Sequence, residues 1–425
     1  MTDERYDFIV LGATGFTGRE AVRYLVSRPP EALGRWAIAG RSKEKLSSVL
    51  AALAPGRDDI GMLVVDMGDA ASVAAMMGRA RVLMHLAGPY APHGETLLRA
   101  CIEHQCHYID LNGEMSWAGR MARKYHERAA ERRVKLVFSA GYEALPFDIA
   151  TLMAVRSLQE QYRVDCRRVD VVATAKMPKG MGPRDLLSGG SINTLREELR
   201  SGTALDMRDP AALIEDDSEA AAVRARSPIV VAPWYDAELG GYIGPGFPAQ
   251  HVNPAIVLRS AALYGAAGLP YGEGFAFREG VRMGPNLGHR AAAQAMCLSI
   301  RATGIATRGR RSRRLLLALL DRIGPVSGEG PSERALAESR YQLVARAEAQ
   351  SGERAWVVLK GEGNPGYRST ARMIVEGTLA LAFDGAKQPP IFGVVTPATG
   401  LGLAIVDRLR DAEITLEVKE TPPGR

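Results

Sequence analysis

Short, mainly apolar segments alternate with helix-length amphipathic segments through the N-terminal third of the chain. The apolar segments, which predict strands, are Phe8–Leu11, Arg35–Ala39, Gly61–Val65, Val82–Leu86, Tyr108–Ile109 and Val134–Phe138. The segments between them, which predict helices, are Arg19–Ser27, Leu46–Leu53, Asp69–Met77, Glu95–Glu103 and Trp117–Arg132. Strands that alternate with helices at this spacing predict an α/β fold with a doubly wound parallel sheet and right-handed crossovers.

The alternation ends at Gly141, and the pattern that follows is different. Val169–Thr174 predicts a strand, and residues 205–250 are rich in Asp, Glu, Gly and Pro, which favours long loops. Tyr341–Ala349 and Ala355–Gly361 alternate in polarity around a short polar turn and predict a β-hairpin in an antiparallel or mixed sheet. A second α/β domain is therefore expected after the first.

The last residues of the chain predict a helix over Gly400–Leu409 and a strand over Ile414–Val418. We expect three parts in the chain. A Rossmann domain covers residues 1–142, an inserted mixed-sheet domain covers residues 143–389, and a C-terminal segment, residues 390–425, returns to complete the first domain.

The first strand leads directly into three glycines, Gly12, Gly15 and Gly18, and a helix follows them. Such a turn presents free backbone N–H groups and a partial positive charge at the start of the helix, which suits a pyrophosphate. The first glycine permits the turn, the second lets the phosphates approach, and the third lets helix and strand pack closely. The predicted dinucleotide-binding residues of this loop are Gly12, Thr14, Gly15, Phe16, Thr17 and Gly18.

The second strand indicates which dinucleotide is bound. NAD-binding folds usually place an acid about 20 residues after the glycines to hold the ribose 2′-hydroxyl. Here no acid lies between Glu31 and Glu44, and the strand ends in Gly40-Arg41-Ser42. Arg41 and Ser42 can bind a 2′-phosphate, so NADP(H) is favoured, although a solvated basic helix start is the alternative.

Two further strand ends are candidates for cofactor contact. Asp66 follows the third strand, where adenine usually lies, although an acid after a strand is also a common helix cap. Gly88, Pro89 and Tyr90 follow the fourth strand, beside the expected nicotinamide position. Tyr90 could bound the ring or donate a proton, and it could equally be an aromatic residue packed under the loop.

Hydride transfer to a carbonyl or an activated alkene needs a proton donor or an oxyanion stabiliser opposite the nicotinamide. None of the 13 tyrosines has a lysine four residues later, so the chemistry of short-chain dehydrogenases is excluded. Glu114, Tyr142, Glu143 and Asp148 follow the fifth and sixth strands, and each could instead be a loop hydrogen-bonder or a helix cap. We choose Glu143 as the acid, with Tyr90 placing the ring and residues 188–192 supplying backbone N–H groups.

Composition limits the function classes. At 425 residues, with 46% hydrophobic and 24% charged residues, the chain is typical of a globular protein with two or three domains. A net charge of +6 is too modest for nucleic-acid binding. Four cysteines without paired spacing favour a reducing cytoplasm, and the start of the chain leaves no room for a signal peptide. Cys101, His104, Cys106 and His107 have poor metal-site spacing, so no metal is expected.

An arginine-rich run precedes a short apolar helix in residues 308–320. This segment could contact an anionic membrane surface or dock an acidic carrier domain. A core helix with a solvated basic lead is the alternative. We also expect a homodimer.

Several segments together resemble the saccharopine dehydrogenase-like oxidoreductases, and within them the trans-acting enoyl reductases. The matching segments are Gly12–Gly18, Ala39–Ser42, Gly88–Tyr90, Tyr108–Glu114, Gly141–Asp148, Ser188–Ile192, Gly363–Tyr367 and Val395–Ala398. Two motifs depart from the family pattern. Glu143 replaces the Asp of Gly-Phe-Asp-Ser-x-Pro, and Asn364 replaces the Asp of Gly-Asp-Pro-Gly-Tyr.

The resemblance implies an NADP-dependent oxidoreductase that reduces an activated C=C or C=O bond in a lipid-like or carrier-bound acyl substrate. An amino-acid dehydrogenase of the saccharopine type is the second hypothesis and would need several basic side chains around two carboxylates. A non-catalytic NADPH-binding regulator is the third and would lack an open substrate pocket.

Overall fold

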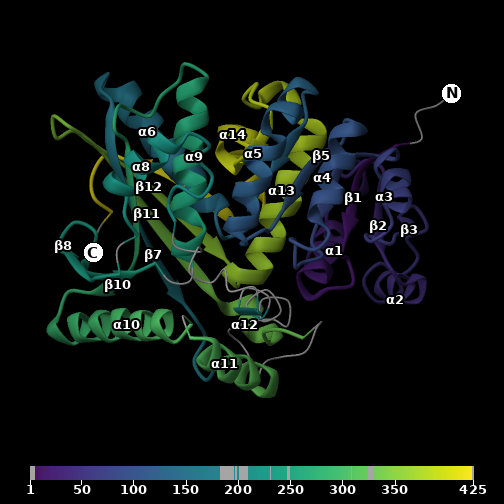
Figure 1. Ribbon diagram of the computed structural model, residues 1–425, viewed down its shortest axis with the longest axis horizontal. Coiled ribbons are helices and arrows are strands. Elements are labelled where there is room, and N and C mark those ends of the chain that lie inside the picture. Colours follow the sequence, from purple (N-terminus) through teal and green to yellow (C-terminus); the bar gives the residue numbers. More distant parts are fainter. Residues whose placement is uncertain are drawn as a thin grey trace.

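The protein folds around two seven-stranded sheets that stand side by side (Figure 1). A computed structural model describes residues 5–181, 196, 199–200, 209–229, 231–246, 249–307, 309–323 and 329–423. In the first sheet every neighbouring pair of strands is parallel, whereas the second sheet is mixed. The expected α/β class with a Rossmann sheet and a mixed sheet is confirmed.

The first sheet has the strand order β3-β2-β1-β4-β5-β6-β13. Its strands are β1 (Tyr6–Leu11), β2 (Trp36–Gly40), β3 (Gly61–Val64), β4 (Ala80–His85), β5 (His107–Asp110), β6 (Lys135–Val137) and β13 (Gly393–Val395). The first six follow the order of a doubly wound dinucleotide-binding sheet, whose ligands lie at the carboxyl ends of the strands. The seventh, β13, comes from the C-terminal part of the chain and pairs with β6.

Both faces of this sheet are covered, which explains why its strands read as continuous apolar runs. In β1, Phe8 and Val10 belong to one hydrophobic cluster, while Ile9 and Leu11 belong to the other. The helices that follow the strands are α1 (Phe16–Ser27), α2 (Lys43–Leu53), α3 (Ala70–Met77), α4 (Gly94–Glu103) and α5 (Met115–Glu131). All five were predicted from the sequence pattern, with ends that differ by a few residues.

The second sheet has the strand order β14-β12-β11-β7-β10-β9-β8. Its strands are β7 (Cys166–Lys176), β8 (Trp234–Asp236), β9 (Gly241–Pro245), β10 (Ala276–Gly284), β11 (Arg340–Ala349), β12 (Arg354–Glu362) and β14 (Ile414–Lys419). The predicted hairpin is β11–β12. Between β6 and β11 the described chain forms the helices α6 (Leu145–Tyr162), α8 (Asp217–Arg226), α9 (Asn253–Ala266), α10 (Leu287–Ala306), α11 (Arg310–Ile323) and α12 (Glu333–Glu338).

Two C-terminal elements lie differently from the expected domain division. Helix α13 (Thr370–Phe383), expected in the second domain, packs on β4 and β5 of the first sheet. A methyl group at Gly377 would lie 2.8 Å from Ile109 Cδ1, so the helix approaches the sheet closely. Conversely β14, expected in the first domain, pairs with the free edge of β12 in the second sheet. Residues 390–425 are thus shared between the two sheets.

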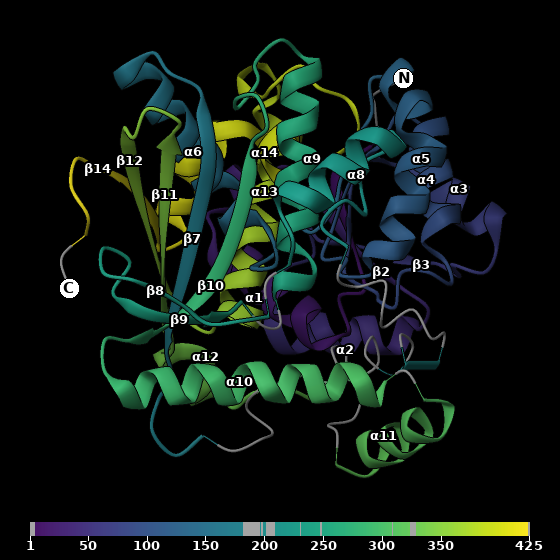
Figure 2. The ribbon, with the colours of Figure 1, turned by 60° about the vertical axis from the view of Figure 1, so that its left-hand side comes forward.

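Residues 205–250, expected as long loops, contain regular elements where the structure describes them. Helix α8 begins at Asp216, whose side chain accepts the Glu219 N–H at 2.7 Å. Strands β8 and β9 are short; β8 pairs with β9, and β9 pairs with β10, which is more distant in sequence. Figure 2 shows that α10 and α11 lie at one end of the molecule, below the second sheet. Two more short helices, α14 (Pro397–Leu401) and α15 (Ile405–Asp411), cover the predicted helix 400–409.

Candidate functional site

The glycine loop after β1 has the close approaches that the sequence predicted. Gly12 has a φ of +95°, and a methyl group there would lie 2.7 Å from the backbone nitrogen of Ala87. A methyl group at Gly18 would lie 2.1 Å from the carbonyl oxygen of Gly12. Gly15 is the N-cap of α1 and brings no capping side chain, and the first turn has no acid. The N-terminus of α1 is therefore open to a phosphate group.

The 2′-phosphate candidates lie at the end of β2. Arg41 is exposed and has no ion-pair partner within the described part of the chain. The Ser42 hydroxyl caps α2 by accepting the Lys45 N–H at 3.2 Å, and it donates to Glu44 at 2.8 Å. Arg41 is therefore available for an anion, whereas Ser42 has a structural role that the sequence analysis did not give it.

Asp66 lies in the loop after β3. Its Oδ1 accepts the N–H of Gly68 at 2.9 Å, and its own N–H lies 3.2 Å from the Ser72 hydroxyl. The cap of the following helix is Asp69, which accepts the Ala71 N–H at 3.0 Å. Asp66 thus shapes a turn at the sheet edge, where its second oxygen makes no hydrogen bond to the described residues.

The loop after β4 is held by Glu114. Its two carboxylate oxygens accept the N–H groups of Tyr90 at 2.8 Å and Ala91 at 2.9 Å. The Glu114 N–H donates to Asn112 Oδ1 at 2.7 Å, so the loop after β5 is fixed at the same time. Glu114, one of the candidate acids, therefore has its carboxylate engaged in positioning the Gly88-Pro89 loop.

Tyr90 packs under this loop. Its hydroxyl donates to the carbonyl oxygen of His85 at 3.3 Å and accepts the Leu111 N–H at 3.2 Å. Burial, and then the charge of Asp110, raise its pKa well above the usual value. Both hydrogen bonds go to the backbone, and the ring lies 4.9 Å from that of His85. These contacts favour the packing alternative over proton donation, and the catalytic role of Tyr90 stays a prediction.

A buried carboxyl joins the neighbouring strand ends. Asp110 accepts the N–H groups of Asn112 at 3.0 Å and Ser139 at 2.9 Å, and the Tyr108 hydroxyl at 2.8 Å. The Tyr108 hydroxyl also lies 2.9 Å from His85 Nδ1. Burial raises the pKa of Asp110 to about 7. The network ties β4, β5 and β6 together beneath the site.

Asp148, another candidate acid, is also fully buried and structural. It accepts the Ser260 hydroxyl at 2.6 Å and the Ala398 N–H at 2.8 Å. These bonds link α6, α9 and α14, and burial raises the pKa of Asp148 to about 7. Both carboxyl oxygens of Asp148 therefore already accept hydrogen bonds from other parts of the protein.

Glu143 differs from the other candidate acids. It lies in the loop after β6, is partly exposed, and its carboxyl makes no hydrogen bond to the described residues. Loss of water around the side chain raises its pKa to about 7. A carboxyl that is half protonated near neutral pH and unbonded can donate a proton to a bound substrate.

A second carboxyl near Glu143 was missed in the sequence. Glu279, in the middle of β10, accepts the Asn253 amide at 2.7 Å on one oxygen. Burial, and then the charge of Glu143, raise the pKa of Glu279 to about 8. The second oxygen of Glu279, Asn253 Oδ1 and Gln250 Nε2 are buried and have no hydrogen-bond partner among the described residues. Unsatisfied buried polar atoms gathered in one place call for a ligand or water.

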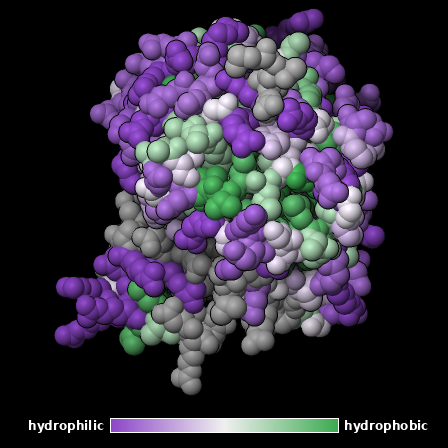
Figure 3. Space-filling model, turned by 90° about the vertical axis from the view of Figure 1, so that its right-hand side faces the viewer, coloured by the Kyte–Doolittle hydropathy of each residue, from purple (hydrophilic) through white to green (hydrophobic). Residues whose placement is uncertain are grey.

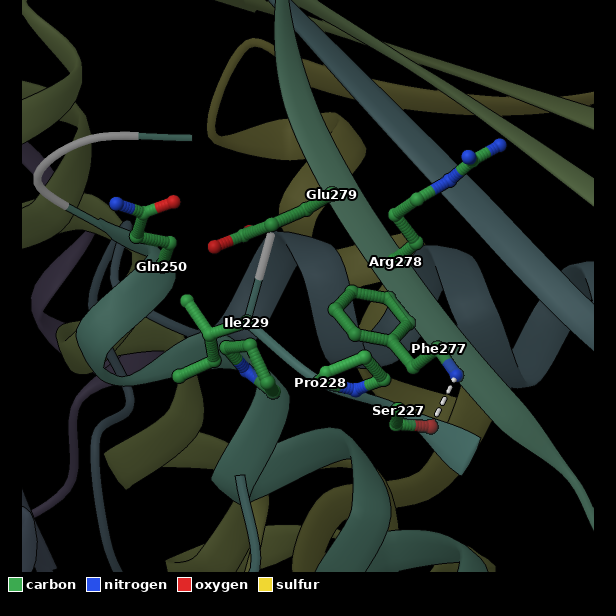
Figure 4. Close-up of a pocket in the computed structure, with 8 residues that line it drawn as sticks. Ser227, Pro228, Ile229, Gln250, Phe277, Arg278 and Glu279 are labelled. Atoms are coloured by element: carbon green, nitrogen blue, oxygen red, sulfur yellow. Dashed lines mark hydrogen bonds between the residues drawn. The ribbon is translucent and has the colours of Figure 1, made fainter. Parts of the chain in front are cut away.

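Glu279 and Gln250 border a small pocket that is partly open to solvent (Figure 4). The Glu279 side chain extends from β10 toward Gln250, and apolar side chains complete the wall. The lining residues are Ser227, Pro228, Ile229, Gln250, Pro254, Phe277, Arg278 and Glu279. The sequence signal for this site was weak, because Glu279 stands in a strand that also carries Arg278 and Arg282.

The second domain approaches the strand ends of the first at several points. A methyl group at Gly113 would lie 3.7 Å from Val252, directly before α9. The Tyr142 N–H donates to Thr370 Oγ1 at 3.0 Å. At the start of α1, the Phe16 ring lies 5.3 Å from the ring of Tyr367. The second domain thus covers the start of α1 and the loop after β6. The expected contribution of residues 188–192 lies outside the described residues.

Asn364, the departure from the family motif, has a clear local role. Its side chain accepts the Gly366 N–H at 3.1 Å and caps the short π-helical turn Pro365–Ser369. Asn serves this turn as well as Asp would.

The comparisons with known proteins agree with this geometry. Residues 8–137 match the saccharopine dehydrogenase NADP binding domain. Together with the two-sheet fold, this match indicates an NADP-dependent oxidoreductase whose NADP(H)-binding domain is similar to that of saccharopine dehydrogenase. The predictions of fold, class and cofactor are confirmed.

Over nearly its whole length the chain is similar to trans-acting enoyl reductases. It is 28% identical to one from Mycobacterium tuberculosis, over 97% of this chain and 98% of the relative. It is 29% identical to a putative trans-acting enoyl reductase of the same organism, over 98% of both. A homospermidine synthase from Legionella pneumophila in complex with NAD has the same overall fold, with a TM-score of 0.52 and 10% identity, covering 98% of this chain and 92% of that structure.

Proposed function

We propose that the protein uses NADPH to reduce a C=C bond conjugated to a carbonyl, or the carbonyl itself, in a lipid-like or carrier-bound acyl substrate. The observation that carries the proposal is Glu143, which has an unbonded carboxyl and a pKa near 7 at the carboxyl edge of a dinucleotide-binding sheet. The names of the similar proteins support reduction of an enoyl group.

The glycine loop fits the pyrophosphate, because α1 starts without a cap and Gly12 and Gly18 leave no room for a side chain. In the proposal Gly12, Thr14, Gly15, Phe16, Thr17 and Gly18 hold the pyrophosphate. Arg41 binds the 2′-phosphate, Asp66 lies against the adenine, and Gly88 and Pro89 lie against the nicotinamide. Bound NADPH supplies a hydride to the substrate.

Glu143 supplies the proton of the reaction. Hydride addition to the β carbon of an enoyl group leaves negative charge on the α carbon and the carbonyl oxygen. The protonated carboxyl of Glu143 gives its proton to the α carbon, and solvent protonates Glu143 again. Glu279, whose pKa is about 8, stays protonated beside Glu143 and so adds no negative charge when Glu143 gives up its proton.

The small pocket beside Glu279 would receive the carbonyl end of the acyl group. Ile229, Pro254 and Phe277 offer apolar contacts, while Gln250 Nε2 can donate to a carbonyl oxygen. The saccharopine-type alternative has less support, because the single basic residue in this lining, Arg278, is paired with Asp170 at 2.8 Å. Among the described lining residues, nothing is suited to two substrate carboxylates.

The test is NADPH oxidation with a panel of enoyl thioesters, ketones and imino acids. We expect turnover of an enoyl thioester, and a loss of about 10²-fold or more in kcat for Glu143→Gln, the usual contribution of a general acid. Glu131→Gln, at an exposed position of α5, is the matched control and should be unaffected. Full turnover by Glu143→Gln, or activity with imino acids alone, would refute the proposal.

The 2′-phosphate assignment has its own test. Arg41→Ala should weaken NADPH binding about tenfold or more, because a charge-assisted hydrogen bond contributes roughly 1.5–3 kcal/mol. NADH binding should be unchanged, since NADH lacks the phosphate. Equal losses for both cofactors would contradict the assignment.

The homodimer and the cytoplasmic location remain predictions. Sedimentation equilibrium of the purified chain tests whether it forms a homodimer.

A further inference from the structure

Residues 280–320, which include α10 and most of α11, carry charge of one sign. Between Glu279 and Asp321 the sequence has eight arginines and neither aspartate nor glutamate. Four of these arginines, Arg310, Arg311, Arg313 and Arg314, lie in the first turns of α11, and all are exposed or partly exposed. Both helices lie at the same end of the molecule (Figure 2).

The same helices expose large apolar side chains. Leu287, Leu298 and Ile305 of α10 are 73%, 57% and 67% exposed, and Leu315 of α11 is 72% exposed. The three α10 residues are spaced by 11 and 7 positions, which places them on one side of a helix with 3.6 residues per turn. In a space-filling view, α11 is the lobe at the lower left, with hydrophobic atoms among hydrophilic ones (Figure 3).

The opposite side of α10 already has a partner. Ala293, Cys297 and Ile300 are buried, and the helix packs on β9 and β10. The exposed apolar row is therefore not needed to hold α10 on the fold. Exposed apolar rows flanked by cations are typical of helices that lie in the plane of a membrane surface.

We infer that α10 and α11 dock the protein on an anionic lipid bilayer. Leucine and isoleucine side chains would enter the boundary between headgroups and acyl chains, while the arginines contact lipid phosphates. A second copy of this chain fits poorly, because a two-fold contact would bring one acid-free arginine surface against another. The row extends along nearly all of α10, a helix of 20 residues and so about 30 Å long, which suits a flat surface.

This inference stands apart from the proposed reaction, since it uses no residue of the candidate site. Within the part of the chain that the structure describes, no helix is both long and apolar enough to cross a membrane. The proposed contact is peripheral, and it should weaken as the ionic strength rises.

The experiment is flotation of the full-length protein with vesicles of phosphatidylcholine alone or with 30% phosphatidylglycerol, at low and high salt. We expect binding to the anionic vesicles only, and a reversal by salt. Substitution of Arg310, Arg311, Arg313 and Arg314 by Gln should lower the partition coefficient at least tenfold, because each cation near the surface contributes about 1 kcal/mol. Leu298→Ser with Ile305→Ser should also lower it, by about tenfold or more.

A control variant with the same change in net charge distinguishes membrane binding through α10 and α11 from binding through any basic surface. Arg120, Arg128, Arg132 and Arg133 lie on or just after α5, at the other end of the molecule, and are exposed (Figure 1). Their fourfold change to Gln should leave vesicle binding intact. Equal losses in the two fourfold variants would overturn the inference, as would no binding to anionic vesicles. A leucine and isoleucine variant that turns a dimer into a monomer but still floats would also overturn it, because a second copy would then be the occupant.

Discussion

Glu279→Gln tests whether a buried carboxyl next to the proton donor is held protonated. Glu279 is buried, has one unpaired oxygen and lies near Glu143. Its pKa is about 8 in the folded protein and 4.5 as its ordinary value. A carboxyl whose pKa is raised by folding stabilises the folded state only while it is protonated. Stability is therefore lost as the pH rises from about 4.5 through 8.

The size of the effect follows from the shift. A difference of 3.5 between the two pKa values, at about 1.4 kcal/mol for each pKa unit, corresponds to roughly 5 kcal/mol at high pH. Part of the shift comes from Glu143, and local relaxation reduces it further, so we expect roughly 3–5 kcal/mol. Glutamine cannot ionise, which removes this loss.

The assay is chemical unfolding of wild type and Glu279→Gln between pH 5 and pH 9. At pH 5 the two free energies of unfolding should agree within about 1 kcal/mol, because glutamine can still accept the Asn253 hydrogen bond. At pH 9 the variant should be more stable by the amount above. Glu131→Gln, at an exposed position, should show no such divergence. A difference that is the same at pH 5 and pH 9 would show that Glu279 does not carry a raised pKa.

Three further predictions concern positions whose geometry is well defined. Gly18→Ala should weaken NADPH binding at least tenfold in equilibrium titration, because its methyl group would lie 2.1 Å from Gly12 O. Gly265→Ala is the control and should leave NADPH binding unchanged, because its methyl group would meet no atom within 4 Å. Tyr90→Phe should keep its turnover and lose about 1–2 kcal/mol of stability in denaturant titration, because only backbone bonds are lost; a large fall in kcat would support the catalytic role. Lys135→Met should destabilise the protein by roughly 2–4 kcal/mol, because Lys135 Nζ donates to three oxygens of residues 388–400; a melting temperature equal to wild type would contradict this.

The sequence correctly predicted those helices and strands whose signals lie in neighbouring residues of the chain. Strands β1, β2, β4, β5 and β6 are mainly apolar and mainly buried, and the helix after β3 has its own start signal in Asp69. The glycine loop was readable for the same reason, since backbone conformation at Gly12 restricts the residue type there. The sheet against which α13 packs, and the sheet that β14 joins, depend on surfaces that are distant in sequence.

The choice among the candidate acids could not be made from the sequence. Glu114, Glu143 and Asp148 all follow strand ends, and each is an acid near a turn. Only the folded structure shows that both carboxyl oxygens of Glu114 and of Asp148 accept hydrogen bonds from backbone N–H or hydroxyl groups. The carboxyl of Glu143 has no such partner among the described residues. Desolvation and hydrogen bonding set the pKa of a carboxyl, and both are produced by residues from other elements.

By itself the sequence determined the dinucleotide-binding sheet, the glycine loop, the preference for NADP(H) and the arginine-rich segment, because each depends on residues that are neighbours in the chain. The tertiary structure decided the rest. It brought Glu279 of β10 and Asn253 of α9 to the loop that carries Glu143, from more than a hundred residues away. It also turned the Leu287 to Ile305 row toward solvent, because only one side of α10 can pack on the second sheet.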